Sequence, residues 1–396
     1  MAQPLMRPSL WGVCLGVGLA VDACAPDDPL PRDPAAAVTA RVQEAGSLLG
    51  LEPAPVLTIG TRGDDALYDV RAAVLAADRL VVASRGQHQV LFYNLQGIRQ
   101  AAVGREGAGP GEFRAIWNMW RYRGDSLLVW DAQLRRASVL STAGRWVRSF
   151  QVEERDQITQ PQVLGTFPDG TLLASANNFH PNTAAGASEF TEDYVRFAPD
   201  GRYMNTIAAR LPSFTMWRGP DGYSWPVPLG PGRYASTDGC VVVTGYTARN
   251  TIERYRCDGT AVDTIATDVE RRAMLAGVAD HQRELWLSQH RASIEAGRST
   301  DPNGWRRRFL EQVPLPDTLP AYASLAVYDN GAIWLTDFLL PDDRLRQATV
   351  LTRAGGRIGE IALPGRARVL DVRDGLVVLL RRDEDDVERI EVYRTM

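Results

Sequence analysis

Short apolar runs recur along most of the chain. They include LVVA at 80–83, VLFY at 90–93, SLLVW at 126–130, TLLAS at 171–175, CVVV at 240–243 and AIWL at 332–335. Most of these runs are rich in β-branched, aromatic or other large apolar residues, which is typical of β-strands. The apolar residues follow one another directly and do not alternate with polar ones. We therefore expect strands that are covered on both faces.

Glycine-containing turns connect these runs in a repeating order. The segments PVLTIGTRGDDALYDVRAAVL, from Pro55, and QAAVGREGAGPGEFRAIWNMW, from Gln100, both contain a short strand, a Gly-x-x-Gly turn and a second strand. A hairpin with Asp-Gly or a similar turn follows each corner, and turns of this kind supply the positive φ that tight hairpins require. The chain contains six such units of roughly 40 residues, a period typical of four-stranded propeller blades.

The two ends of the repeat complement each other. The sixth unit begins near Arg366 and lacks its outer strand, whereas Pro55–Gly60 is an outer strand without a unit of its own. Pairing of Pro55–Gly60 with Val387–Tyr393 would close a ring. The sequence therefore predicts an all-β fold, a six-bladed β-propeller of four-stranded antiparallel blades. A β-sandwich, the alternative, would show a cleaner alternation of polar and apolar residues.

One glycine-rich corner, Gly104–Arg114, also has the composition of a phosphate-binding loop. Such a loop needs a helix after it, because the anion binds to the free N–H groups at the helix N-terminus. The residues that follow, AIWNMW, predict a strand. We therefore expect this segment to turn the chain from one blade to the next.

The second repeat resembles a known family. Gly104, Gly107, Gly111 and Phe113, followed by LLVWD ending at Asp131 and RRASVLSTAG ending at Gly144, are similar to an NHL repeat. The chain from Pro55 onward resembles the exported six-bladed β-propeller proteins of bacteria. This resemblance implies a ligand at the mouth of the central channel, and it implies no particular activity.

The N-terminus predicts export. Arg7, an apolar run from Leu10 to Val21 and small residues around Cys24 have the pattern of a signal peptide, which we place at residues 1–25. Val21–Cys24 resembles a lipobox, so Cys24 is a candidate lipid anchor, and cleavage after Ala25 is the alternative. Residues 26–54 are expected to form a polar linker before the propeller at 55–396. The expected location is the periplasm or cell envelope, with membrane attachment only through Cys24.

Composition limits the partners and the chemistry. The formal net charge of −4 and the lack of a strongly basic stretch argue against nucleic acid as a partner. The 396 residues include no lysine, which excludes Schiff-base chemistry on lysine. We expect a monomer.

Two cysteines remain outside the predicted signal peptide. Cys240 and Cys257 lie about equally far from the turn at Thr247–Asn250, between two strand-like runs. Antiparallel pairing of these runs places the cysteines opposite each other, within reach of a disulfide. Two buried free thiols are the alternative.

Two long insertions interrupt the period. Asn177–Asp193 is expected to join the second and third strands of blade three, and Thr267–Val313 to join blades four and five. Both connections emerge at the same end of a ring of four-stranded meanders. The second insertion has helical periodicity, and it is expected to be either a lid or partner-docking surface, or a packed decoration.

A third segment, PSFTMWRGPDGYSWPVPLGPG, is expected to form a rim loop. The candidate ligand-binding residues on this face are Asn118, Asn178, His180, Trp217 and Trp225.

Catalytic and metal-binding patterns are scarce. The chain has four histidines, and none of them has the spacing of a zinc site. Six-bladed lactonases bind calcium through Glu, Asn and Asp, and calcium is possible here with Asn118 as a ligand, although the other inner strands offer no matching partners. Asp131 and Asp337 are expected to cap turns. The acidic segment Asp383–Asp386 is expected to be a solvated turn. No catalytic or metal-binding residue is assigned.

The sequence thus predicts an exported propeller that binds a small molecule or a protein at the loop-rich face of its channel and performs no chemistry. A calcium-dependent channel hydrolase of the lactonase type and a structural protein of the cell envelope are the alternatives.

Overall fold

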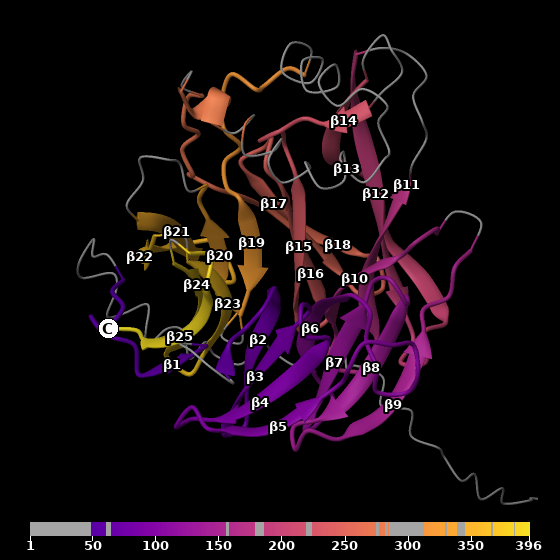
Figure 1. Cartoon of the computed structure of the whole chain (residues 1–396). Helices are drawn as coiled ribbons and strands as arrows, with labels where there is room; N and C mark the ends of the chain where they lie inside the picture. The colour runs from indigo at the N-terminus through magenta and orange to yellow at the C-terminus, as the bar shows by residue number, and fades with distance from the viewer. Residues whose placement is uncertain are drawn as a thin grey trace, which may run out of the picture.

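The chain folds into a ring of six β-sheets (Figure 1). The structure is a computed structural model, and it describes residues 49–60, 65–155, 158–178, 186–218, 224–274, 277–281, 284, 313–328, 331–338, 345–365, 367–383 and 385–396. Five sheets have four strands and the third has five. Every strand pairing between neighbours in these sheets is antiparallel. The predicted six-bladed β-propeller is confirmed.

Each blade is a meander that runs outward from the central axis. Blade one contains β2 (Val70–Ala76), β3 (Arg79–Ser84), β4 (Gln89–Asn94) and β5 (Arg99–Val103). Blade two contains β6 (Ile116–Tyr122), β7 (Ser126–Asp131), β8 (Arg136–Ser141) and β9 (Trp146–Gln151). Blade three contains β10 (Gln162–Thr166), β11 (Leu172–Asn178), β12 (Gly186–Phe197), β13 (Tyr203–Arg218) and β14 (Ser224–Pro226).

The other three blades follow the same order. Blade four contains β15 (Arg233–Asp238), β16 (Val241–Tyr246), β17 (Thr251–Arg256) and β18 (Ala261–Ala266). Blade five contains β19 (Ser324–Val327), β20 (Ile333–Thr336), β21 (Leu345–Leu351) and β22 (Arg357–Pro364). Blade six contains β23 (Arg368–Arg373), β24 (Leu376–Arg382), β25 (Glu388–Arg394) and β1 (Leu57–Ile59).

Blade six joins the two ends of the propeller. β1 pairs with β25 in the register Leu57↔Val392, Thr58↔Glu391 and Ile59↔Ile390, so the predicted ring closure is confirmed. Pairing with the ring begins before β1, because Leu49 forms a bridge with Ile361 and Leu51 forms one with Thr395. The sequence predicts residues 49–54 to be part of the linker. The first of these residues instead pair with blades five and six.

The core is divided among the blade junctions. Each of six clusters of buried apolar side chains draws on two neighbouring blades. The cluster between blades six and one, for example, contains Ile59, Leu80 and Leu91 with Val378 and Ile390. This arrangement explains the nearly continuous apolar runs, because a central strand packs against a blade on each side.

The corner after blade one turns the chain. The N–H of Gly107 donates to the carbonyl of Phe113 (3.1 Å), and the N–H of Phe113 donates to the carbonyl of Arg105 (2.9 Å). The Phe113 side chain is fully buried. Gly104 has a φ of +116°, and a Cβ there would lie 2.5 Å from the carbonyl oxygen of His88. Strand β6 follows, so the corner leads into no helix.

The outer half of blade three differs from the prediction. The expected insertion Asn177–Asp193 is strand at both ends, since β11 includes Asn178 and β12 begins at Gly186. The expected rim loop is also strand in part, because β13 continues to Arg218 and β14 pairs with it. Stacking of Phe190 on Phe214, at 5.0 Å between ring centroids, supports the lengthened β12–β13 pair. Pro212 is accommodated where the register of this pair shifts.

The insertion between blades four and five contains less described helix than predicted. Residues 267–274 are not helical, and Ala273 forms a bridge with Thr318. Residues 277–281 are helical, whereas most of the remainder to 312 lies outside the described residues. This short helical segment and β14 lie on the same side of the ring, the upper side in Figure 1. None of the described helical segments is long and apolar enough to cross a membrane.

Candidate functional site

A channel with a volume of about 660 Å³ lies between the inner strands of the six blades. Arg71 (β2) and Arg368 (β23) line it where inner strands begin, whereas Arg123 lines it where β6 has ended. The end marked by Arg71 and Arg368 is here called the mouth. The connection from blade four enters β19 at its first residue, Ser324, so the insertion emerges at the mouth. β11 also ends at the mouth, because it runs antiparallel to β10.

Hydrogen bonds from side chains link the inner strands around the channel. Thr166 Oγ1 donates to the carbonyl of Arg121 (3.1 Å), and Thr237 Oγ1 donates to the carbonyl of Thr166 (3.1 Å). Ser236 Oγ accepts from the N–H of Val327 (3.1 Å). These contacts join blades two to three, three to four and four to five, and they hold the channel wall in place.

An ion pair joins blade two to blade six across blade one. Asp371 Oδ2 accepts from Arg121 Nη1 (2.6 Å), and Asp371 Oδ1 accepts from Arg121 Nη2 (3.2 Å). Asp371 Oδ2 also accepts from the N–H of Leu75 (2.8 Å), and Arg121 Nη1 donates to the carbonyl of Leu75 (3.1 Å). The Asp371 side chain is 3% exposed and that of Arg121 is 26% exposed. We call this set the Arg121–Asp371 lock.

Four of the inner strands carry a β-bulge near their first residues. The extra residue is Arg71 in β2, Trp117 in β6, Leu164 in β10 and Leu370 in β23. Arg71, Leu164 and Leu370 line the channel, and Asn118 follows Trp117 on its wall. Bulges redirect the side chain of the extra residue and occur often beside functional sites.

Two of the bulged residues contact each other at the mouth. The guanidinium carbon of Arg71 lies 5.2 Å from the ring centroid of Trp117, which is a cation–π distance. Trp117 remains 46% exposed. With its amide oxygen facing the indoles, Gln162 accepts from the Nε1 atoms of Trp117 (3.3 Å) and Trp130 (2.8 Å). The exposed indole is thus held in place by groups from blades one and three.

Arg368 lies beside Arg71 and has no acidic partner among the described residues. Its Nη2 donates to the carbonyls of Val70 (2.8 Å) and Arg71 (3.2 Å). Arg368 is exposed and lines the channel. Partial desolvation lowers the pKa of Arg368, and the positive charge of Arg71 lowers it further. Burial also lowers the pKa of Arg71, while Asp69 opposes that shift.

The carboxylates at the mouth are already engaged. Asp69 pairs with Arg71 (3.2 Å) and with Arg85. Glu388 pairs with Arg382 (2.6 Å) and accepts from the N–H of Val70 (2.6 Å). Among the residues that the structure describes here, four arginines (Arg71, Arg85, Arg368 and Arg382) lie near these two carboxylates, an excess of two positive charges.

The predicted ligand-binding residues that the structure describes belong to blades two and three. Asn118 lines the channel. Asn178 is the last residue of β11 and pairs with Thr191. Trp217 and Trp225 are cross-strand partners on β13 and β14. His180 lies outside the described residues. The binding role of these residues stays a prediction.

Arg71, Trp117 and Arg368 are not among the residues predicted from the sequence. One feature of the sequence does point to them. The inner-strand segments VRAAV, IWNMW and RVLDV each place a large polar or aromatic residue at or next to the strand start. Strand propensity alone does not distinguish these positions from their neighbours. The bulges that redirect the side chains of Arg71 and Trp117 become visible only in the register of strand pairing.

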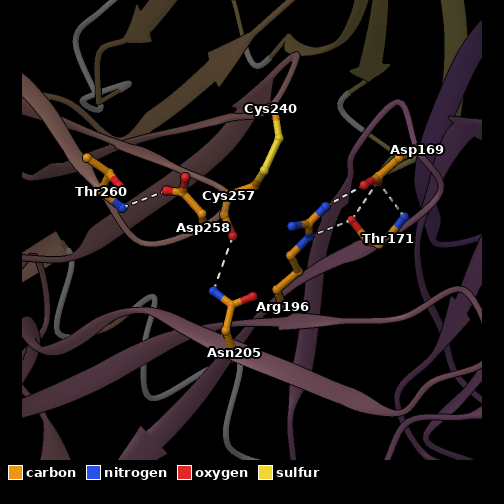
Figure 2. Close-up of a disulfide and its surroundings, with 8 residues drawn as sticks. All are labelled: Asp169, Thr171, Arg196, Asn205, Cys240, Cys257, Asp258 and Thr260. Carbon is orange, nitrogen blue, oxygen red and sulfur yellow. Dashed lines mark hydrogen bonds and ion pairs between the residues drawn. A yellow bond between two sulfur atoms is a disulfide. The ribbon is translucent and has the colours of Figure 1, made fainter. Parts of the chain in front are cut away.

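The disulfide lies at the opposite end of blade four from the mouth. Cys240 and Cys257 are joined, with their Cα atoms 5.3 Å apart (Figure 2). The N–H of Cys257 donates to the carbonyl of Cys240 (2.8 Å), and Asn205 of blade three donates to the carbonyl of Cys257 (3.2 Å). The bridge therefore ties together two turns and contacts the neighbouring blade.

The described channel residues do not supply a calcium site of the lactonase type. The carboxylates among them are Asp238 and Asp371. Asp238 is paired with Arg353 (2.6 Å) and Asp371 with Arg121 (2.6 Å). Across the described part of the chain, no three His, Cys, Asp or Glu side chains gather closely enough to hold a metal ion.

Asp131 caps a turn, as predicted. This fully buried carboxylate accepts from the N–H groups of Arg114 (2.7 Å), Ala115 (3.1 Å) and Leu134 (2.9 Å). Its hydrogen-bonding capacity is used to fix the start of β6. It therefore offers no acid or base to the channel.

A second group of buried polar side chains lies between blades three and four. Tyr194 donates to Glu192 (2.8 Å) and contacts Thr244 (3.0 Å), while Arg233 donates to Glu253 (2.8 Å). Burial raises the pKa of Glu192, and the hydrogen bond from Tyr194 and the charge of Arg233 oppose the shift. These contacts are internal to the blade junction, so we assign the group to structure.

No model of a protein family matches the chain, and no curated protein matches it. The resemblance of the second repeat to NHL repeats therefore stays a prediction.

Solved structures do resemble the chain. A member of the DUF4221 family from Bacteroides vulgatus aligns with 89% of this chain and 99% of its own, at 9% identity and a TM-score of 0.50. A protein from Bacteroides fragilis, named as a predicted exported protein, aligns with 89% of this chain and 96% of its own, at 10% identity and a TM-score of 0.47. Regucalcin, a calcium-binding protein from Agrobacterium tumefaciens, covers 88% of this chain and 96% of its own, at 8% identity and a TM-score of 0.42. At such low identity the likeness concerns the fold alone, and this chain is a six-bladed β-propeller.

Proposed function

We propose that this protein is an exported binding protein that takes a small molecule into the mouth of its central channel and performs no chemistry on it. The observation that carries the proposal is the channel itself. Its volume of about 660 Å³ lies within the roughly 300–1,000 Å³ typical of small-molecule sites. Arg71, Arg368 and Asn118 line the channel near its mouth, with Trp117 beside Arg71, and we place the entry of the ligand there.

The lining favours binding over catalysis. General acid–base catalysis needs a titratable group within reach of the ligand. Among the described lining residues, both carboxylates are ion-paired and none is a histidine. Burial raises the pKa of the Tyr328 hydroxyl, so this lining residue stays protonated and is a poor base. The remaining polar groups suit recognition by hydrogen bonds and charge.

Export is supported by two features of the chain. Residues 1–25 have the pattern of a signal peptide, with Cys24 as a candidate lipid anchor. The Cys240–Cys257 disulfide suits an oxidising compartment such as the periplasm. The ligand is then a molecule that is present outside the cytoplasm.

Capture of a ligand tests the proposal. The purified chain is incubated with a small-molecule extract of a bacterial culture, desalted and measured by native mass spectrometry. Asn118→Trp fills the channel wall near the mouth, and Gln100→Trp places the same side chain on the exposed outer strand β5 as a control. Melting temperatures show whether both variants fold.

We expect a mass adduct on the wild type and on Gln100→Trp, and none on Asn118→Trp. The proposal is refuted if the wild type carries no adduct, or if Asn118→Trp retains it in full.

A further inference from the structure

We infer that the mouth recognises an oxyanion, a carboxylate, phosphate or sulfate group of the ligand, held between Arg71 and Arg368 beside the exposed face of Trp117. This inference rests on the proposed function, because it names the chemical class of the ligand for the same site. Its evidence is separate, since it comes from the charges and not from the size of the channel.

The first argument is the uncompensated charge of Arg368. Two guanidinium groups close to each other repel unless an acidic group balances their charge. Arg368 is exposed in the channel and donates hydrogen bonds only to backbone carbonyls among the described residues, and Arg71 beside it adds a second positive charge. An anion bound here would offset the repulsion between the two groups.

The second argument is that the nearby carboxylates are bonded to groups other than Arg368. Glu388 uses one oxygen for the N–H of Val70 and the other for Arg382, so it fixes the start of β2. Asp69 is shared by Arg71 and Arg85. Neither acid contacts Arg368, which leaves the Nη1 and Nε atoms of Arg368 without a hydrogen-bond partner among the described residues.

The third argument is geometry. Arg71 is the extra residue of a bulge, and its side chain is stacked on Trp117 (5.2 Å), so its position is fixed before a ligand arrives. Guanidinium groups bind carboxylates and phosphates through paired N–H donors. Trp117, 46% exposed, offers a flat apolar surface for the part of the ligand next to the anionic group.

The opposite end of the channel provides a matched control. Arg123 also lines the channel and is exposed, and it lies after the end of β6. Arg123→Gln and Arg368→Gln remove the same charge from the two ends of one channel. Any effect of net charge alone is therefore shared by both variants.

Fluorescence quenching of Trp117 tests the inference without knowledge of the ligand. The chain has ten tryptophans, so the contribution of Trp117 is obtained as the difference between proteins with and without Trp117→Phe. Iodide replaces chloride at constant ionic strength as the anionic quencher, and acrylamide serves as the neutral quencher. Inorganic phosphate, sulfate and acetate are then added separately as competitors, also at constant ionic strength.

We expect Arg368→Gln to lower iodide quenching of Trp117 by about two- to fourfold, because one of the two positive charges that attract iodide to the mouth is lost. Acrylamide quenching should stay unchanged, and Arg123→Gln should behave like the wild type. At least one of the three oxyanions should reduce iodide quenching in the wild type and have no effect in Arg368→Gln, and the strongest competitor identifies the preferred group.

The inference is overturned if iodide quenches Trp117 equally in Arg368→Gln and the wild type, or if no oxyanion competes. These outcomes are distinct from failure of the proposed function. A captured ligand without an acidic group would refute the anion site alone, whereas oxyanion competition without any captured ligand would refute the proposed function alone.

Discussion

Replacement of Asp371 by Asn tests whether the Arg121–Asp371 lock holds the inner strands of three blades together. The substitution keeps the size of the side chain and removes its charge. One amide oxygen can still accept from the N–H of Leu75, but the paired contact with Arg121 is lost. Arg121 then remains partly buried without its counter-ion.

The magnitude follows from the contacts. Hydrogen bonds to charged groups contribute about 1.5–3 kcal/mol each, and breaking a buried ion pair costs roughly 3–5 kcal/mol. Because Arg121 is 26% exposed, water replaces part of what is lost. We expect the free energy of unfolding to fall by about 2–4 kcal/mol, which corresponds to a melting temperature roughly 3–6 °C lower for a chain of this length.

The assay is a double-mutant cycle followed by circular dichroism and tryptophan fluorescence in urea. Arg121→Met removes the ion-pair partner of the buried Asp371 carboxylate and should destabilise at least as much as Asp371→Asn. The double variant should lose about 2 kcal/mol less than the sum of the two single variants, since neither charge is then left alone. Asp374→Asn is the control, because Asp374 is 85% exposed, and it should change stability by less than about 0.5 kcal/mol.

Two results would refute this reasoning. One is an Asp371→Asn protein whose stability matches that of Asp374→Asn. The other is strict additivity in the cycle, which would show that the two side chains do not interact.

Three further predictions concern closure, the disulfide and pH. Ile59→Ala opens a cavity in the cluster between blades six and one and should cost about 2–4 kcal/mol in urea unfolding, whereas Val56→Ala, at a half-exposed position, should cost under about 0.5 kcal/mol. Cys240→Ser with Cys257→Ser should lower the free energy of unfolding by about 3 kcal/mol, the value for a closed loop of 17 residues, and a reducing agent should lower the wild type to the same value. Burial raises the pKa of Glu192 above its ordinary 4.5, so the folded state binds this proton more tightly than the unfolded state. Its contribution to stability is complete below pH 4.5 and is lost as the pH rises through the folded pKa. Glu192→Gln removes this loss, so its melting temperature relative to the wild type should rise with pH above 4.5.

Each of these predictions has a contradicting result. Equal effects of Ile59→Ala and Val56→Ala would mean that β1 does not seal the ring. A wild type insensitive to reducing agent would mean that the disulfide adds no stability. A constant difference between Glu192→Gln and the wild type across this pH range would mean that Glu192 titrates normally in the folded state.

The architecture was predictable because its signals are local and repeated. Turn glycines such as Gly144 and Gly201 adopt positive φ at corresponding hairpins of blades two and three. The missing outer strand of the sixth unit and the surplus strand at Pro55–Gly60 pointed to closure before any contact was known. Repetition made the prediction robust, since one misread unit would not have changed the count.

The candidate site was less predictable because its contacts are long-range. Arg121 and Asp371 are 250 positions apart, and no local pattern links them. Arg368 contacts Val70, 298 positions away, only because the ring brings blade six against blade one. The strand ends of β12 and β13 were missed because Ala187, Ser188 and Glu189 resemble a polar loop, whereas the stacked Phe190 and Phe214 stabilise the pairing.

The position of a bound anion at the mouth tests the central claim most directly. Crystals of the wild type and of Arg368→Gln, soaked in sodium iodide, would reveal iodide by its anomalous scattering. We predict an iodide peak within about 4 Å of the guanidinium of Arg368 on the side facing Arg71, and its loss in Arg368→Gln. A wild-type channel with no peak at the mouth, or a peak that persists unchanged in Arg368→Gln, would contradict the account.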